Sequence, residues 1–204
     1  MQPFIRLESI GCPLPLTGVD TDQLIPARFM KRSRAEGYGG YLLHDLRFEG
    51  EGAPLADFPL NQPLYQGAEV LVARRNFGSG SSREAAVYAL ADFGFRCVVA
   101  PSFGDIFASN AVNNGLLPAR VSEADCEALL AGLATHNRVV VDLEACTIVC
   151  GNLSVPFEVD PVWRTKLLNG WDDIDLTLSR QTEIAAFTAA DAGLRPWMAP
   201  RRPE

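Results

Sequence analysis

The sequence has 204 residues, of which 48% are hydrophobic and 21% are charged. This composition is typical of a globular protein with a sizeable core, and no apolar run approaches the roughly 18–20 residues of a membrane-spanning helix. The net charge of −7 argues against a nucleic-acid-binding protein, because such proteins carry a basic face. An anionic ligand would therefore have to be held by local arginines and backbone amides.

The cysteines and the N-terminus indicate a reduced, cytoplasmic protein. The five cysteines are odd in number and none forms a C-x-x-C pair, which is typical of free thiols in a cytosolic protein. Cys146 and Cys150 flank a strand-like run far from either histidine, so no complete zinc or iron–sulfur site is expected within this chain. The N-terminus has neither a basic start nor an apolar signal core.

The N-terminal third has one clear strand followed by long irregular segments. Residues 4–10 alternate as a strand, which the Gly-Cys-Pro at 11–13 is expected to end. Residues 17–30 are irregular, and residues 37–67 are rich in glycine and proline, which predicts a loop with short elements. A loop of this length indicates a functional surface.

Strands and helices alternate from residue 67 onward. Strands are expected at 69–73, 97–100, 138–143, 147–150 and 153–159. Helices are expected at 82–93, 103–112, 122–135, 160–168 and 173–190. This order predicts a βαβ-type α/β core. We expect residues 1–204 to form a single domain, with a core at about 4–160, C-terminal helices at about 160–193 and a tail at 194–204.

The segment at 76–84, Asn-Phe-Gly-Ser-Gly-Ser-Ser-Arg-Glu, carries the strongest chemical signal. It lies between a predicted strand and a predicted helix, where glycines bring backbone amides close to a ligand and the helix N-terminus favours negative charge. The hydroxyls and the Arg83 guanidinium add directed donors, so the segment predicts an anion site. It is neither a dinucleotide fingerprint nor a Walker motif nor a nucleophile elbow.

A capping interpretation stays open for the same residues. Ser81 and Glu84 have the spacing of a capping box, in which both side chains satisfy the first amides of the helix. The preceding Gly-Ser-Gly and the adjacent Ser82-Arg83 go beyond what a cap requires, which favours the anion site. Ser102 and Asp105 are expected to cap the next helix.

The segment at 76–84 resembles the signature of the small subunits of 3-isopropylmalate dehydratase, in the aconitase superfamily. Residues 18–29, Gly-Val-Asp-Thr-Asp-Gln-Leu-Ile-Pro-Ala-Arg-Phe, are similar to the opening motif of that family. Further motifs match in order at 100–118 and 167–174. The resemblance therefore covers nearly the whole chain, from about residue 4 to about residue 190.

The resemblance implies a fold, a partner and a reaction. The fold would be the swivelling β/β/α domain of the superfamily, with a C-terminal helical extension. A separate large subunit would hold a [4Fe–4S] cluster on three cysteines, and this chain would bind no cofactor or metal. Substrate would lie between the subunits and would be isomerised from 2-isopropylmalate to 3-isopropylmalate through 2-isopropylmaleate, a step of leucine biosynthesis.

The same resemblance assigns roles to three residues. Ser81 would be the general base that takes the carbon-bound proton, and Ser82 and Arg83 would bind a substrate carboxylate. A serine hydroxyl is ordinarily a very poor base. The role therefore requires an alkoxide that helix amides and nearby cationic charge stabilise within a closed cleft.

Two other regions are candidate parts of the site. One region consists of Asp20, Thr21 and Asp22. These residues either contact the side chains that bind substrate or form the caps of a turn. The other region coincides with the loop that discriminates substrates in relatives, or is a solvated basic loop. It consists of Met30, Lys31, Arg32, Ser33 and Arg34.

Two positions depart from the family pattern. Ala85 stands where histidine usually follows Ser-Arg-Glu, and Gly18 stands where asparagine is usual. Ser81, Ser82 and Arg83 are retained, so a dehydratase small subunit remains the main interpretation. One alternative is the small subunit of a sister dehydratase acting on a methylmalate, citraconate, dimethylmalate or homoaconitate type of diacid. The other is a non-catalytic anion-binding module.

Overall fold

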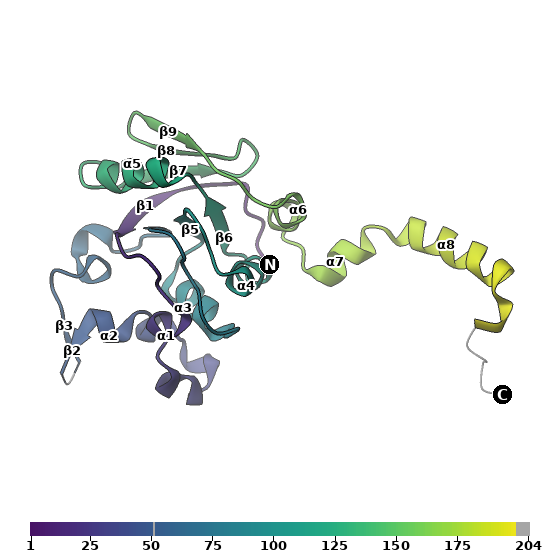
Figure 1. The fold of residues 1–204 in the computed structure, drawn as a ribbon, viewed down its shortest axis with the longest axis horizontal. Helices are drawn as coiled ribbons and strands as arrows, with labels where there is room; N and C mark the ends of the chain where they lie inside the picture. The colour runs from purple at the N-terminus through teal and green to yellow at the C-terminus, as the bar shows by residue number, and fades with distance from the viewer. Residues whose placement is uncertain (51, 199–204) are drawn as a thin grey trace.

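The computed structural model describes residues 1–50 and 52–198, which form a mixed sheet flanked by helices, a small two-stranded sheet and a helical extension at the C-terminal end (Figure 1). The strands are β1 (Arg6–Leu14), β2 (Phe48–Glu49), β3 (Ala53–Pro54), β4 (Val70–Ala73), β5 (Cys97–Ala100), β6 (Leu117–Arg120), β7 (Arg138–Asp142), β8 (Thr147–Cys150) and β9 (Leu153–Pro156). The helices are α1 (Thr21–Leu24), α2 (His44–Arg47), α3 (Ala85–Phe93), α4 (Asp105–Asn113), α5 (Glu123–Leu133), α6 (Pro161–Asn169), α7 (Asp173–Leu178) and α8 (Gln181–Leu194).

Most of the other regular structure consists of short 3-10 helices. They are η1 (Ala27–Lys31), η2 (Arg34–Glu36), η3 (Gly39–Tyr41), η4 (Pro59–Asn61), η5 (Pro63–Tyr65) and η6 (Pro196–Met198). The segment at 37–67 is thus a loop with short elements, as the glycine and proline content predicts. Of the tail expected at 194–204, residues 199–204 lie outside the described residues.

The main sheet has seven strands in the order β6-β5-β4-β1-β7-β8-β9. β1, β4, β5 and β6 are parallel, and β7, β8 and β9 continue the sheet as an antiparallel meander. Helices α3 and α4 connect the parallel strands. The predicted α/β class is confirmed. The predicted order of strands and helices missed β6, and the single helix expected at 173–190 is wrong because α7 and α8 are separate helices there.

Both faces of the parallel part of the sheet are buried. On β5, Val98 and Ala100 belong to one apolar cluster with residues of α3 and α4, whereas Cys97 and Val99 belong to a second cluster with residues of α5. Side chains alternate between the two faces of a strand, so a strand covered on both faces contains an uninterrupted apolar run. This is why the sequence alone locates β4 and β5.

β1 is longer than the sequence indicates, because it changes partner along its length. Residues 6–10 pair antiparallel with β7, and residues 11–14 pair parallel with β4. The pairing with β7 ends at Ile10, so the proline at position 13 removes no hydrogen bond from that side of the strand. The prediction that the Gly-Cys-Pro at 11–13 ends the strand is therefore wrong.

Helices α7 and α8 project away from the body of the molecule (Figure 1). α8 has no buried residue, and α7 has none either. Their exposed large apolar side chains are those of Ile174, Leu178, Ile184, Phe187 and Leu194. An apolar surface of this kind on a helix usually marks an interaction site. Within the described residues, no helix is long and apolar enough to cross a bilayer.

Candidate active site

The carboxyl ends of β1, β4 and β5 lie at one edge of the sheet, and the loops that follow these strands meet there. A bridge joins Asp20, after β1, to Ser79, after β4. A second bridge joins Phe77, after β4, to Phe103, after β5. This edge is where open α/β sheets usually bind ligands. The topology therefore places the segment at 76–84 at the edge of the sheet where a ligand-binding site is expected.

Close packing fixes the shape of the segment. Gly78 has a φ of +70°, and a Cβ built on it would lie 2.2 Å from the ring atom Cγ of Phe107. Only glycine fits this position, because any side chain would overlap the aromatic ring and strain the backbone. Asn76 also adopts the left-handed region, with a φ of +61°. The backbone that presents Ser81 is thus set by tertiary contacts.

Ser102 holds the same segment and does not cap α4. Its hydroxyl oxygen accepts a hydrogen bond from the Asn76 amide at 2.8 Å, and its carbonyl accepts one from the Phe77 amide at 3.0 Å. Gly104 is the N-cap residue of α4, without a side-chain cap hydrogen bond, and Asp105 is the first helical residue. The capping prediction for Ser102 and Asp105 is therefore wrong. Ser102 instead supports the backbone of the segment at 76–84, a role that the sequence analysis did not predict.

Ser81 and Glu84 do not form a capping box. α3 begins at Ala85, and its N-cap residue Glu84 makes no side-chain cap hydrogen bond. Instead, the carboxylate of Glu84 accepts a hydrogen bond from the side-chain amide of Asn114 at 2.8 Å. The capping interpretation and the predicted helix start at 82 are both wrong, because tertiary contacts shape the turn. The first turn of α3 leaves the Ser81 hydroxyl unused.

α1 supports the segment from the side of β1. Thr21 is 1% exposed, its amide donates to the Ser79 carbonyl at 2.9 Å, and its hydroxyl oxygen accepts from the Ser81 amide at 3.2 Å. Asp20 forms a capping box with Gln23 at the start of α1. Asp20 therefore acts as a helix cap, whereas the neighbouring threonine contacts the serine segment directly.

Arg83 forms an ion pair with Asp22, between Nη1 and Oδ1. The Arg83 side chain is 29% exposed and that of Asp22 is 58% exposed, so solvent screening keeps the contribution to stability below about 1 kcal/mol. A guanidinium has five N–H donors in a planar fork, of which one carboxylate uses only part. The ion pair therefore orients Arg83 and leaves donors available to an anion.

Ser81 and Ser82 lie on an open surface. Both residues are exposed. A cavity of about 490 Å³ lies near α4, but its lining comes from residues 103–120 and 158–163, not from the segment at 76–84. Within the described residues, the serines are thus not enclosed.

The loop at residues 30–34 contacts α3 through Arg34. It spans the end of η1 and the start of η2. The guanidinium carbon of Arg34 lies 3.5 Å from the centroid of the Tyr88 ring, on the outer side of α3. The structure therefore brings this loop next to the helix that follows the serine segment.

The cysteines do not form a metal site within residues 1–50 and 52–198, where no group of three His, Cys, Asp or Glu side chains is arranged to hold a metal ion. All five cysteines are free thiols. Burial raises the pKa of Cys12 to about 12 and that of Cys126 to about 11, so these thiols stay protonated and are poor ligands. The donor set does not fit an iron–sulfur cluster.

Comparison with known proteins gives consistent matches. Residues 1–124 match the family described as the aconitase C-terminal domain. The 3-isopropylmalate dehydratase small subunit of Rhodospirillum centenum is 46% identical over 97% of this chain and 98% of its own length. The small subunits of Paramagnetospirillum magneticum and Sinorhizobium medicae are each 44% identical over 97% of this chain and 100% of their own lengths.

A solved structure has a similar fold. A crystal structure of 3-isopropylmalate dehydratase from Methanocaldococcus jannaschii matches with a TM-score of 0.65. The match covers 89% of this chain and 99% of that chain, at 24% sequence identity. At this level of identity the similarity concerns the fold.

Proposed function

The chain belongs to the family of 3-isopropylmalate dehydratase small subunits, in the aconitase superfamily, and from this premise we propose that it supplies one half of a hydro-lyase active site. The reaction would isomerise 2-isopropylmalate to 3-isopropylmalate through 2-isopropylmaleate, in leucine biosynthesis in the cytoplasm. The observation that supports this most directly is the Ser81-Ser82-Arg83 segment, in which both serines are exposed in front of α3 and none of the three residues caps the helix.

Each residue of the segment has a role that its chemistry permits. Ser81 takes or returns the proton at carbon, and Ser82 and Arg83 bind a substrate carboxylate. The N-terminal end of α3 and the Arg83 guanidinium supply positive potential, which favours the alkoxide form of Ser81. Asp22 keeps the guanidinium oriented through its ion pair. Thr21 holds the Ser81 backbone in place through its hydroxyl.

The partner would be a large subunit that also carries the iron–sulfur cluster. Two features support this. The serine segment is open and needs a cover, and the extension formed by α7 and α8 exposes apolar residues. The whole chain would act as a single swivel-type domain, with its core at about 4–160 and its C-terminal helices at about 160–193 reaching toward the partner.

The two departures from the family pattern, at Gly18 and Ala85, are compatible with 2-isopropylmalate as the substrate. Gly18 has a φ of +69°, a conformation that both glycine and the usual asparagine adopt readily. Ala85 is the first residue of α3, after the three proposed functional residues, so the change from histidine alters none of them. The basic residues at 30–34 would discriminate among branched diacids from their place beside α3.

An anaerobic reconstitution tests the proposal. The chain is mixed with the cluster-loaded large subunit of the same organism, and hydration of 2-isopropylmaleate, citraconate and dimethylmaleate is followed. We expect activity only with both chains and a preference for 2-isopropylmaleate. Preference for another diacid would reassign the substrate to a sister dehydratase. Inactivity on all three, with an intact cluster, would favour a non-catalytic module.

A further inference from the structure

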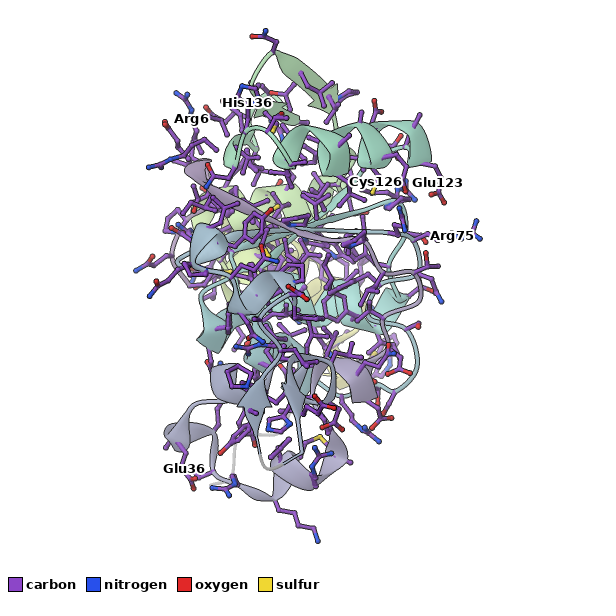
Figure 2. All side chains as sticks on the ribbon, turned by 90° about the vertical axis from the view of Figure 1, so that its left-hand side faces the viewer. Arg6, Glu36, Arg75, Glu123, Cys126 and His136 are labelled. Atoms are coloured by element: carbon purple, nitrogen blue, oxygen red, sulfur yellow. The ribbon has the colours of Figure 1, made fainter. Side chains whose placement is uncertain are left out.

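A loop rich in basic residues lies next to the proposed site. Its basic residues are Arg28, Lys31, Arg32 and Arg34, and we call residues 28–34 the arginine loop. The loop follows α1, which contacts the serine segment, and it packs on α3, which begins just after that segment. Glu36, just beyond the loop, lies at one end of the molecule, opposite the end that holds His136 (Figure 2).

Tyr88 of α3 provides the surface on which the middle of the loop rests. The guanidinium carbon of Arg34 lies 3.5 Å from the Tyr88 ring centroid, and its Nη2 lies 3.8 Å from Oδ1 of Asp92. Tyr88 and Asp92 are one helical turn apart and share a face of α3. Burial and then the Glu84 carboxylate raise the pKa of the Tyr88 hydroxyl, which keeps the ring neutral.

The chain after the loop is fixed to the same helix. The Tyr38 amide donates to Oδ2 of Asp92 at 2.9 Å, and the Tyr38 hydroxyl donates to the Arg32 carbonyl at 2.9 Å. A Cβ built on Gly39 would lie 2.7 Å from backbone atoms of Asp92 and Phe93, so the backbones are in direct contact there. At the other end, Arg28 is paired with Asp45. Between these points, Arg34 links the loop to α3.

We propose that Tyr88 is a positioning residue, which holds the arginine loop against α3 and so fixes the position of the loop relative to an incoming dicarboxylate. Three of its four basic residues pair with carboxylates, Arg28 with Asp45, Arg32 with Glu36 and Arg34 with Asp92, so the loop would act on a dicarboxylate through its position and not through unbalanced charge. The inference rests on the proposed function for its effect on substrate. The contact between Tyr88 and Arg34 stands independently of that function.

Kinetics of the enzyme assembled with its large subunit test the effect on substrate. Tyr88→Ala should raise KM about 5- to 10-fold, the range of a partly desolvated cation–π contact, and leave kcat within about twofold. Tyr88→Phe should behave as wild type, because the ring is retained. Arg34→Ala should raise KM similarly, and the double variant should be no worse than either single one. Additive effects, or an equal defect in Tyr88→Phe, would overturn the proposal.

Trypsin cleavage of the chain tests the contact without any activity. Lys31, Arg32 and Arg34 are trypsin sites, and Arg180 between α7 and α8 serves as an internal reference. Tyr88→Ala should speed cleavage in the loop severalfold relative to cleavage at Arg180, and Tyr88→Phe should not. Unchanged loop cleavage would refute the role of Tyr88. An inactive wild-type assembly with faster loop cleavage in Tyr88→Ala would instead refute the proposed function alone.

Discussion

Ser81 lies four residues before the start of α3, and the helix makes no use of its hydroxyl. Ser81→Ala should therefore leave the free energy of unfolding within about 0.5 kcal/mol of wild type, as expected for a surface residue outside any cap. It should lower kcat at least about a hundredfold, because a positioned base contributes that much or more. Thermal melts of the isolated chain and steady-state kinetics of the assembled enzyme measure the two effects.

Ser122→Ala is the matched control for this variant. The Ser122 side chain caps α5 by accepting from the Asp125 amide at 3.1 Å. Its loss should cost about 0.5–2 kcal/mol of stability and leave kcat unchanged. If Ser81→Ala were destabilised to the same degree but kept its turnover, Ser81 would be a structural residue and the proposed base would lie elsewhere.

Arg83 acts through the geometry of its guanidinium. Arg83→Lys retains the positive charge and an ion pair with Asp22, but lysine cannot bind a carboxylate with two parallel hydrogen bonds. We expect kcat/KM to fall about 10- to 100-fold, in line with the loss of one charge-assisted hydrogen bond. Asp22→Asn, which keeps the guanidinium and weakens only its orientation, should show a smaller loss. Near-normal kinetics of Arg83→Lys would contradict the assigned role.

The segment proposed as the site could be singled out from the sequence, but the contacts that support its backbone could not. The segment at 76–84 contains its own donors, so residue types alone identify it. Ser102 supports it from 26 positions away in the chain, through a hydrogen bond to the Asn76 amide. Ser81 and Glu84 have the local pattern of a cap that distant contacts override. A one-dimensional pattern contains no information about such distant partners.

At the level of elements, predictability follows burial. β4 and β5 are covered on both faces, so each contains an uninterrupted apolar run that the sequence analysis identifies as a buried strand. β1 continues through the proline at position 13, because β7 no longer pairs with it there. The starts of helices are predictable where a cap is local, as at Ser122, and are wrong where a tight loop precedes the helix, as at α3.

Lys166 joins three helices near the base of the extension. Its side chain on α6 is 4% exposed, and Nζ donates to Oδ1 of Asn113 at the end of α4 at 2.5 Å. It also donates to Oδ1 of Asp173 at the start of α7 at 2.6 Å. Methionine at this position has a similar shape but loses both hydrogen bonds; because Asn113 and Asp173 are exposed and water can replace the donor, the loss should cost about 0.5–1.5 kcal/mol.

Lys166→Met should therefore lower Tm by about 2–4 °C for each kcal/mol lost in a chain of this size. It should also loosen α7, which amide hydrogen exchange would detect as faster exchange in residues 173–178. Asp173→Asn is the control, because its side chain is 73% exposed and its charge is screened. Equal destabilisation by the two variants would mean that the ion pair, and not the contact with Asn113, holds the helices together.

For the whole molecule, the body and the extension differ in how they bury apolar surface. The body has two apolar clusters, one on each side of the sheet, which include residues from nearly every strand. The extension has no buried residue in α7 or α8 and carries a net charge of −3 over residues 172–195, from five acidic and two basic residues. A second acidic copy of this chain is a poor match for that segment. We therefore predict that the extension binds the large subunit, through a surface of complementary charge.

Phe187 is a suitable site for testing that assignment, because it is 66% exposed in the middle of α8. Phe187→Glu should leave the thermal stability of the isolated chain unchanged and weaken its binding to the large subunit at least about tenfold, since a charge would enter an apolar contact. Thr182→Glu adds the same charge at an exposed polar position of the same helix and should bind as wild type. Equal dissociation constants by calorimetry for both variants would place the interface elsewhere. Sedimentation that showed wild-type dimers lost only in Phe187→Glu would assign the extension to self-association instead.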